Sequence, residues 1–297
     1  MPVDDATYRG WPGTAKATRW VAVAIAGTMI RRLMKLRLVR YIVLIFPLGA
    51  CLLASIVLTL AHEGESLPML RGLPIKASEL LPFLNIWFQN FIGFFGILLA
   101  AMVGAPLIAE DRRTRALALY FSRPITHFDY VFGKFLTVAL FLTFLVVVPP
   151  VVMFLLDIGL ADQKGVFWDR VPILLRSVVP SFVRVALLSV VALAASSLAK
   201  RTNYAALLLL GVMMVATIAS QLLARRIFND PVWLAISPGQ CAMRIAHDLL
   251  PLPPLLNRQG RFLQSMDVGY AWLGVGIWTA TGLAVLVGRI RNVEVVA

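Results

Sequence analysis

This sequence has little charge, few histidines and almost no cysteine, and each shortage excludes a class of protein. Only 14% of its 297 residues are charged, against about 25% in an average soluble domain, so an ordinary water-soluble fold is excluded. The histidines (His62, His127, His247) are scattered, and Cys51 and Cys241 lie in different kinds of segment. Such scatter predicts no metal site, no disulfide between the cysteines and no catalytic cluster within a span.

The phosphate-binding loop of ATPases is also missing. Its pattern GxxxxGK[ST] finds no match, because Gly133–Lys134 is followed by Phe135 and lacks the upstream glycine. The chain is therefore predicted to be no enzyme and to bind no cofactor of its own.

Long apolar runs are what the sequence does contain. Its residues are 60% hydrophobic and its mean hydropathy is +0.83, and runs of about 20 residues with few charges predict transmembrane helices. We predict an all-α integral membrane protein with one transmembrane domain over residues 1–297. Its six predicted spans are Tyr41–Leu60, Phe83–Ala109, Phe135–Leu156, Val178–Ala199, Asn203–Ala224 and Val268–Gly288.

The basic residues predict the orientation of these spans. The formal net charge is +13, but the basic residues flank apolar runs, which favours anionic lipid headgroups over nucleic acid as their partner. One side of the predicted bundle carries 17 Lys and Arg and the other carries 10. By the positive-inside rule both termini are cytoplasmic, with tails at 1–40 and 289–297 around a bundle at 41–288.

Two further segments predict short helices outside the spans. Trp20–Ile30 has no charge but is too short to cross a bilayer, so it is predicted to be an interfacial or buried helix before the first span. Residues 225–267 are too long for a simple turn and contain five prolines. There Ser237 can cap a helix that starts with Pro238 and runs toward His247. We expect its helices to rest on the outer membrane surface.

The most informative segment is Glu110–Lys134, EDRRTRALALYFSRPITHFDYVFGK, which we call the elbow. It is charged and joins the second and third spans, so it is predicted to be cytoplasmic. Its first half favours a helix that Pro124 stops, and Thr126 with Asp129 forms a capping pair for the next helix. A solvated loop whose arginines bind headgroups is the alternative explanation.

The elbow resembles that of the permease subunits of type-2 ABC transporters (the ABC-2 family). The shared features are an acidic residue leaving the second span, a Leu-x-Leu-x-x-Ser-Arg-Pro-Ile stretch and a Gly-Lys pair opening the third span. Here these are Glu110, Leu117, Leu119, Ser122, Arg123, Pro124, Ile125, Gly133 and Lys134. Arg115–Ala116 replaces the usual glycine-threonine, which puts the local turn of the elbow in doubt.

The resemblance implies a coupling helix that docks on a separate ATP-hydrolysing subunit, which holds ATP and Mg. It also implies a homodimer or pseudo-dimer of permeases in a bacterial-type inner (cytoplasmic) membrane. The residues assigned to coupling are Glu110, Asp111, Arg112, Arg113, Leu117, Tyr120, Phe121, Ser122, Arg123 and Pro124.

Polar residues within the spans are candidates for a translocation path. Asn85, Gln89 and Asn90 open the second span, and Arg184 lies six residues into the fourth. Buried amides need partners, so they either line an outer mouth or form hydrogen bonds between helices. Arg184 either faces substrate, pairs with an acid such as Asp157, or extends to the interface.

Two functions fit these features. The first is export of a substrate, which the sequence does not identify, by an ABC transporter. The second is a mechanical transmitter that relays ATP hydrolysis to a membrane or external partner, for which 225–267 would be the contact. A secondary transporter is disfavoured because buried carboxylates are few.

Overall fold

The computed structural model describes residues 21–62, 77–114, 116, 126–159, 166–250 and 258–291. Within these ranges the chain is all-helical, without strands. Six helical segments are long and apolar enough to cross a membrane, as predicted. They are Arg37–Thr59, Gly93–Arg113, His127–Gly159, Arg170–Leu198, Thr202–Ile227 and Val268–Arg289.

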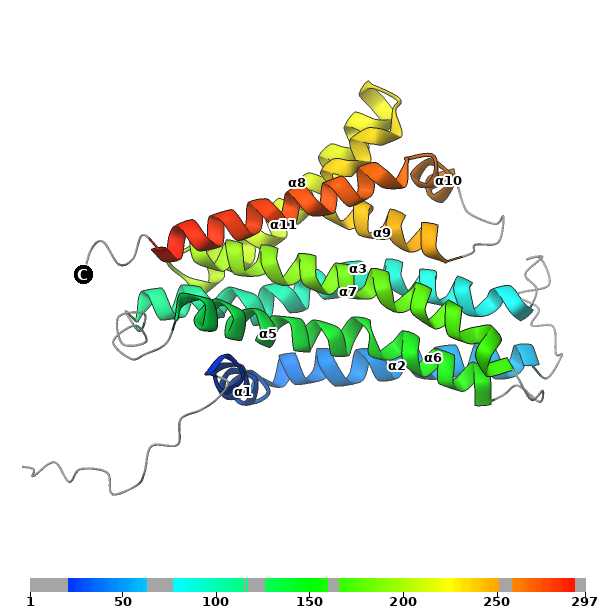
Figure 1. The fold of residues 1–297 in the computed structure, drawn as a ribbon, viewed down its shortest axis with the longest axis horizontal. Coiled ribbons are helices and arrows are strands. Elements are labelled where there is room, and N and C mark those ends of the chain that lie inside the picture. The colour runs from blue at the N-terminus through cyan, green and yellow to red at the C-terminus, as the bar shows by residue number, and fades with distance from the viewer. Residues whose placement is uncertain are drawn as a thin grey trace, which may run out of the picture.

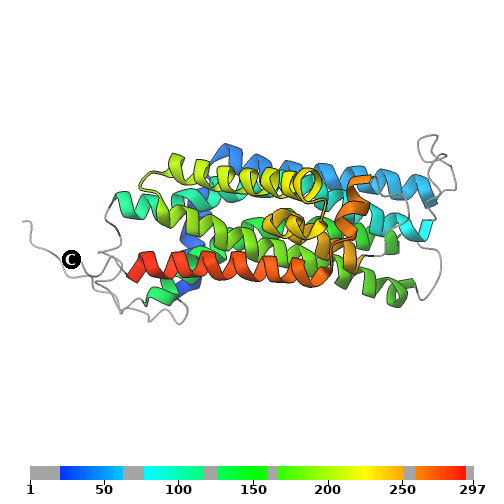
Figure 2. The same cartoon turned by 90° about the horizontal axis from the view of Figure 1, so that it is seen from above.

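The predicted helix before the first span is present and lies across the bundle. Helix α1 (Val21–Leu33) is separated from α2 (Arg37–His62) by a short break at residues 34–36. Figures 1 and 2 both show α1 crossing the long helices at one end of the bundle. The described part of α11 (Val268–Arg291) finishes at this same end.

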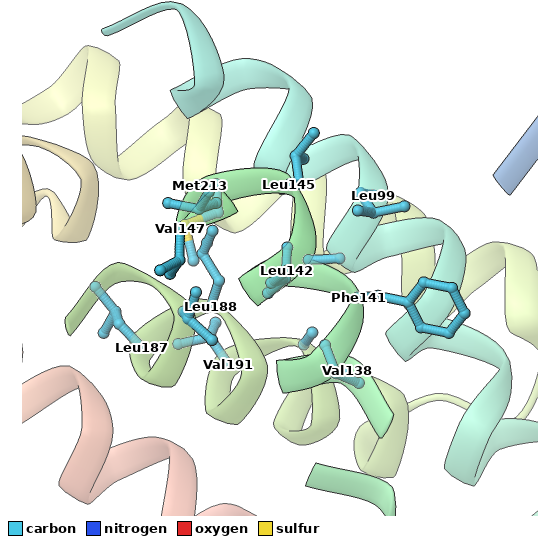
Figure 3. Close-up of a cluster of buried hydrophobic side chains, with 14 of the residues drawn as sticks. Leu99, Val138, Phe141, Leu142, Leu145, Val147, Leu187, Leu188, Val191 and Met213 are labelled. Atoms are coloured by element: carbon cyan, nitrogen blue, oxygen red, sulfur yellow. The ribbon is translucent and has the colours of Figure 1, made fainter. Parts of the chain in front are cut away.

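The core is built by α3 (Ala77–Arg113), α5 (His127–Val146) and α7 (Val166–Leu198). The span within α7 is 72% buried, whereas those of α2, α8 and α11 are each 22% buried, so α7 lies at the centre. Figure 3 shows the apolar side chains that fill this core from all three helices, among them Leu99, Leu142 and Leu188.

Small residues let α3 and α7 approach closely. A Cβ added at Gly104 would lie 2.8 Å from Cβ of Ala192, closer than real contacts allow. Gly104, four residues after the small residue Ala100, therefore marks a close contact between the two helices.

The third span is broken near its middle. α5 ends at Val146 and α6 (Val148–Gly159) follows after one residue, with Pro149 and Pro150 in its first turn. Prolines lack the amide hydrogen and clash with the preceding turn, which accounts for this break.

Between the last two spans the structure has several short helical elements. After α8 (Thr202–Leu222) come the π-helical turn η1 (Leu223–Ile227), the 3₁₀ turn η2 (Pro231–Ile236), α9 (Pro238–Leu249) and α10 (Arg258–Gln264). The Ser237 cap of α9 is confirmed, because its side chain accepts a hydrogen bond from the Gln240 amide.

The prediction that these helices rest on the outer surface is wrong for α9. This helix packs against α3, α7, α8 and α11, and Figure 1 shows it running back beside α11. Ala242, Ile245 and Ala246 are at most 2% exposed. The helix itself was predicted correctly, but its apolar face binds the bundle instead of the membrane surface.

Candidate functional site

The first group of candidate residues is the stem of the elbow, Glu110–Arg113, which forms the last turn of α3. On the far side of the elbow, α5 begins with the predicted cap, in which Thr126 Oγ1 accepts a hydrogen bond from the Asp129 amide at 3.1 Å. The remaining predicted coupling residues lie outside the described residues. They are Leu117, Tyr120, Phe121, Ser122, Arg123 and Pro124.

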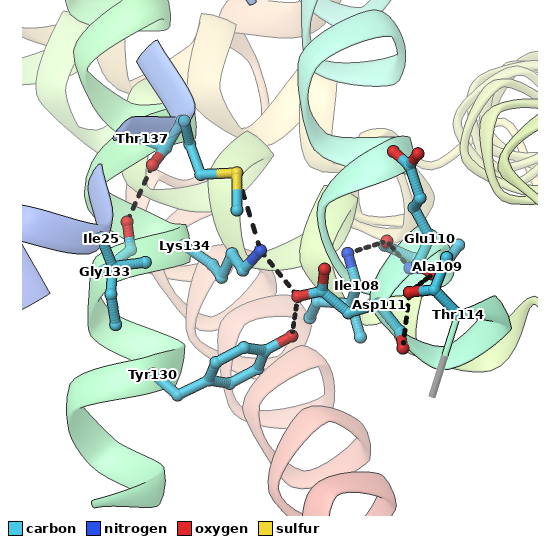
Figure 4. Close-up of polar contacts among 12 residues, drawn as sticks. Ile25, Ile108, Ala109, Glu110, Asp111, Thr114, Tyr130, Gly133, Lys134 and Thr137 are labelled. Atoms are coloured by element: carbon cyan, nitrogen blue, oxygen red, sulfur yellow. Dashed lines mark hydrogen bonds and ion pairs between the residues drawn. The ribbon is translucent and has the colours of Figure 1, made fainter. Parts of the chain in front are cut away.

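A buried ion pair joins the two ends of the elbow. Lys134 Nζ lies 2.8 Å from Asp111 Oδ2, and the Lys134 side chain is fully buried. The Tyr130 hydroxyl donates a hydrogen bond to the same oxygen at 2.8 Å. Figure 4 shows both α5 side chains pointing at Asp111. A buried charge is tolerated when it is paired and hydrogen-bonded, so this cluster fixes α3 against α5.

The other stem residues contact α1 and α7. Glu110 Oε1 is 2.9 Å from Arg32 Nη2 of α1, a pair that is largely exposed and therefore weak. Arg113 lies 4.0 Å from the same carboxylate. The Arg112 guanidinium donates to the Ser197 carbonyl at the end of α7. Glu110, Asp111 and Arg112 thus connect α1, α5 and α7 to α3.

Helix α1 also sits directly on α5. A Cβ added at Gly133 would lie 2.9 Å from the Ala22 carbonyl oxygen and 3.1 Å from Cβ of Ile25. Glycine is therefore required for this approach, which gives a structural reason for the first residue of the Gly-Lys pair.

One turn before the stem, Ser196 of α7 bonds to the backbone of α3. The Ile108 and Ala109 amides each donate to Ser196 Oγ at 3.0 Å, and its hydroxyl donates to the Ala105 carbonyl at 2.7 Å. These groups flank Pro106, which lacks an amide hydrogen and disturbs the ladder of helix hydrogen bonds there. No sequence pattern predicts this contact, because it depends on the packing of two helices that are distant in the chain.

The second group of candidates lies in the half of the bundle farther from the elbow. A cavity of about 780 Å³, open on one side, is lined by residues of α3, α7, α8, α9 and α10. Among the predicted path residues, Gln89, Asn90 and Arg184 line it. Asn85 does not; its Nδ2 donates to the Leu81 carbonyl of its own helix.

Arg184 is the buried cationic residue of the cavity wall. It is 5% exposed, and its guanidinium donates to the Gln89 carbonyl and approaches Met243 Sδ at 3.7 Å. Gln89 Nε2 in turn donates to Ser181 Oγ at 2.5 Å. The hypothesis that Asp157 pairs with Arg184 is not supported, because Asp157 instead lies 3.2 Å from Arg170 Nε.

The α9 residues of the cavity were missed by sequence reasoning. Met243 and His247 line it, but α9 was expected at the surface. His247 is 7% exposed, and neither ring nitrogen has a hydrogen-bond partner within the described chain. Burial, together with the positive charges of Arg244 and Arg184, lowers the pKa of His247 to about 4, so the imidazole is neutral at pH 7.

Comparison with known proteins agrees with the elbow and the six spans. Residues 23–255 match the family model described as "ABC-2 family transporter protein". No curated protein matches the chain. Membership of this family implies an ABC ATPase as partner. The match covers most of the sequence, and the chain belongs to the ABC-2 family of transporter proteins, as a non-catalytic, multi-pass membrane subunit.

Proposed function

We propose that this chain is the permease of an ATP-driven exporter, worked by a separate ATPase that docks on the elbow. The ATPase would hold ATP and Mg and would contact Leu117–Pro124. Both termini and the elbow would face the cytoplasm of a bacterial-type cell, with α1 at the inner interface. The 297 residues would act as one domain, paired with a second permease.

The observation that carries this proposal is the buried contact between Asp111 and Lys134. Because it joins the two ends of the elbow, a displacement of the elbow moves α3 and α5 together. The contacts of Arg112 and Ser196 extend this unit to α7. Helices α3 and α7 also form walls of the cavity, so movement at the elbow would change the shape of the cavity.

Transport is favoured over pure mechanical transmission by the cavity and by α9. A transmitter needs a surface for its external partner, and α9, the longest helix of the 225–267 segment, is instead packed inside the bundle. The internal cavity, lined by Arg184 and Gln89, is a feature that a transporter uses.

The test is a complex of this chain with its ATPase, reconstituted in proteoliposomes. Leu117→Cys should form a crosslink to a cysteine on the ATPase, and Leu117→Asp should abolish permease-dependent stimulation of ATP hydrolysis. Arg201→Asp, in the neighbouring connection between α7 and α8, is the matched control and should keep stimulation. Equal effects of the two charge changes, or an ATPase that never approaches residue 117, would contradict the proposal.

A further inference from the structure

The cavity combines one cationic group with apolar walls, and this combination points to a substrate class. Resting on the proposed transport function, we infer that the cavity takes an anionic amphiphile, with its acidic head at Arg184 and its apolar chain between α3 and α8. A volume of about 780 Å³ falls within the range of roughly 300–1,000 Å³ found for small-molecule sites.

The first argument is the missing counter-charge of Arg184. Two other cations in the core each have a carboxylate, since Lys134 pairs with Asp111 and Arg170 with Asp157. Among the described residues no carboxylate forms a salt bridge with Arg184, although it is 5% exposed. A guanidinium has five N–H donors in a planar fork that suits a carboxylate or phosphate. An acidic head would supply the charge that the described part of the chain does not.

The second argument is the set of unused polar atoms beside Arg184. Gln89 Oε1 and both ring nitrogens of His247 have no hydrogen-bond partner within the described chain. Buried polar atoms are normally satisfied, so unpartnered ones in a cavity wall indicate a ligand or water. A neutral imidazole can donate one hydrogen bond to a head-group oxygen and accept another from a hydroxyl.

The third argument is the apolar opening of the cavity. Trp87 and Phe94 of α3 and Met214 and Ile218 of α8 all line it, yet each is between 45% and 64% exposed. These side chains therefore face both the cavity and the outside of the bundle. Phe94, Met214 and Ile218 lie within the spans Gly93–Arg113 and Thr202–Ile227, where that outside is lipid, so the cavity opens sideways to the acyl chains. A ligand dissolved in the bilayer could enter with its tail still in apolar surroundings.

The experiment measures binding by quenching of Trp87 fluorescence. The purified full chain in phosphatidylcholine nanodiscs is titrated with dibromostearate or with brominated phosphatidylglycerol. These two anionic probes separate a free fatty acid from a membrane phospholipid as the source of the head. The methyl ester of dibromostearate and brominated phosphatidylcholine are the uncharged and zwitterionic controls. Subtracting the signal of Trp87→Phe isolates the tryptophan at the cavity from the six others.

We expect saturable quenching by at least one anionic probe at low mole fraction, and at least tenfold weaker binding of its control. Arg184→Gln should weaken anionic binding tenfold or more, and Arg184→Lys less. Arg176→Gln, an exposed arginine two turns away on α7, should leave binding within twofold of the unaltered chain.

Equal quenching by anionic and control probes would overturn the inference, as would equal behaviour of the two glutamine variants. The inference would also be overturned if neither anionic probe gave saturable quenching. That result is expected if a second copy of this chain covers the opening of the cavity. If Arg184→Gln does not fold, the head-group comparison on the unaltered chain decides alone. The assay contains no ATPase or nucleotide, so failure of the coupling proposal leaves its result intact.

Discussion

Asp111 and Lys134 are 23 residues apart in sequence, yet their charged atoms lie 2.8 Å apart inside the protein. Asp111 is in the last turn of α3 and Lys134 is two turns into α5. Residues 112–133, most of the elbow, lie between them in the sequence. The two ends of the elbow are therefore held together, and we expect a force applied to the elbow to reach both helices.

Breaking this ion pair from one side should be costly. Removing one partner of a buried pair leaves the other charge uncompensated, which costs about 3–5 kcal/mol. Lys134→Met and Asp111→Leu should each lower the free energy of unfolding by about this amount, measured by SDS titration in mixed micelles. The double variant should lose less than either single variant. Additive losses would mean that the two groups do not depend on each other.

Gly133 and Gly27 form a matched pair for testing how α1 is seated. A Cβ at Gly133 meets the Ala22 carbonyl at 2.9 Å, whereas one at Gly27 meets nothing within 4 Å. Gly133→Ala should lower the thermal midpoint and expose α1 to protease. Gly27→Ala should be neutral or raise stability by about 0.5–1 kcal/mol, because alanine favours helix. A stabilising Gly133→Ala would show that α1 does not press on α5.

Neighbouring serines of α7 allow a test of the α3 contact. Ser196→Ala leaves two amides of α3 without their acceptor, so a loss of about 1–3 kcal/mol is expected. Ser197→Ala should cost less, because the Ser197 hydroxyl donates to the Ala194 carbonyl of its own helix. Unfolding of both variants in detergent gives the comparison. Equal losses would argue against a bridging role for Ser196.

His247 should make the protein less stable in mild acid. Its pKa falls from 6.5 to about 4 in the folded state. Between these two pH values the His247 imidazole binds a proton in the unfolded chain but not in the folded chain. Stability should then decrease by up to about 1.4 kcal/mol for each pH unit between 6.5 and 4. Burial is the main cause of this lowered pKa, and the positive charges of Arg244 and Arg184 add to it.

The check is the thermal midpoint across this pH range for the unaltered chain and for His247→Phe. The thermal midpoint of the variant should depend less on pH, because the contribution of this histidine is absent. An unchanged slope would mean that His247 is accessible to protons in the folded protein.

Features that depend on local sequence were predictable. The six spans follow from apolar runs, and the caps at Thr126 and Ser237 follow from residues at fixed offsets from each helix start. The break at Pro149–Pro150 likewise needs only the chemistry of proline. Each of these is decided within a few residues, where composition and spacing carry the information.

Features that depend on distant packing were not predictable. The sequence marks Asp111 and Lys134 as charged but does not indicate that they meet. The amphipathic pattern of α9 fits a membrane surface and a helix bundle equally well, and packing such as that of Cys241 against Gly274 of α11 shows which one it binds. The cavity depends on the placement of α9, so the sequence could not show that Met243 and His247 line it.

The continuity of α3 has a thermodynamic consequence. At 37 residues and 1.5 Å per residue it is about 55 Å long, and it runs unbroken from the cavity wall to the elbow. If the substrate and the ATPase both act on this one helix, their affinities for the chain are reciprocally linked. A compound that binds the cavity more tightly in one orientation of α3 must change the affinity of the ATPase for this chain by the same factor. The ATPase could then be used to screen for the transported substrate.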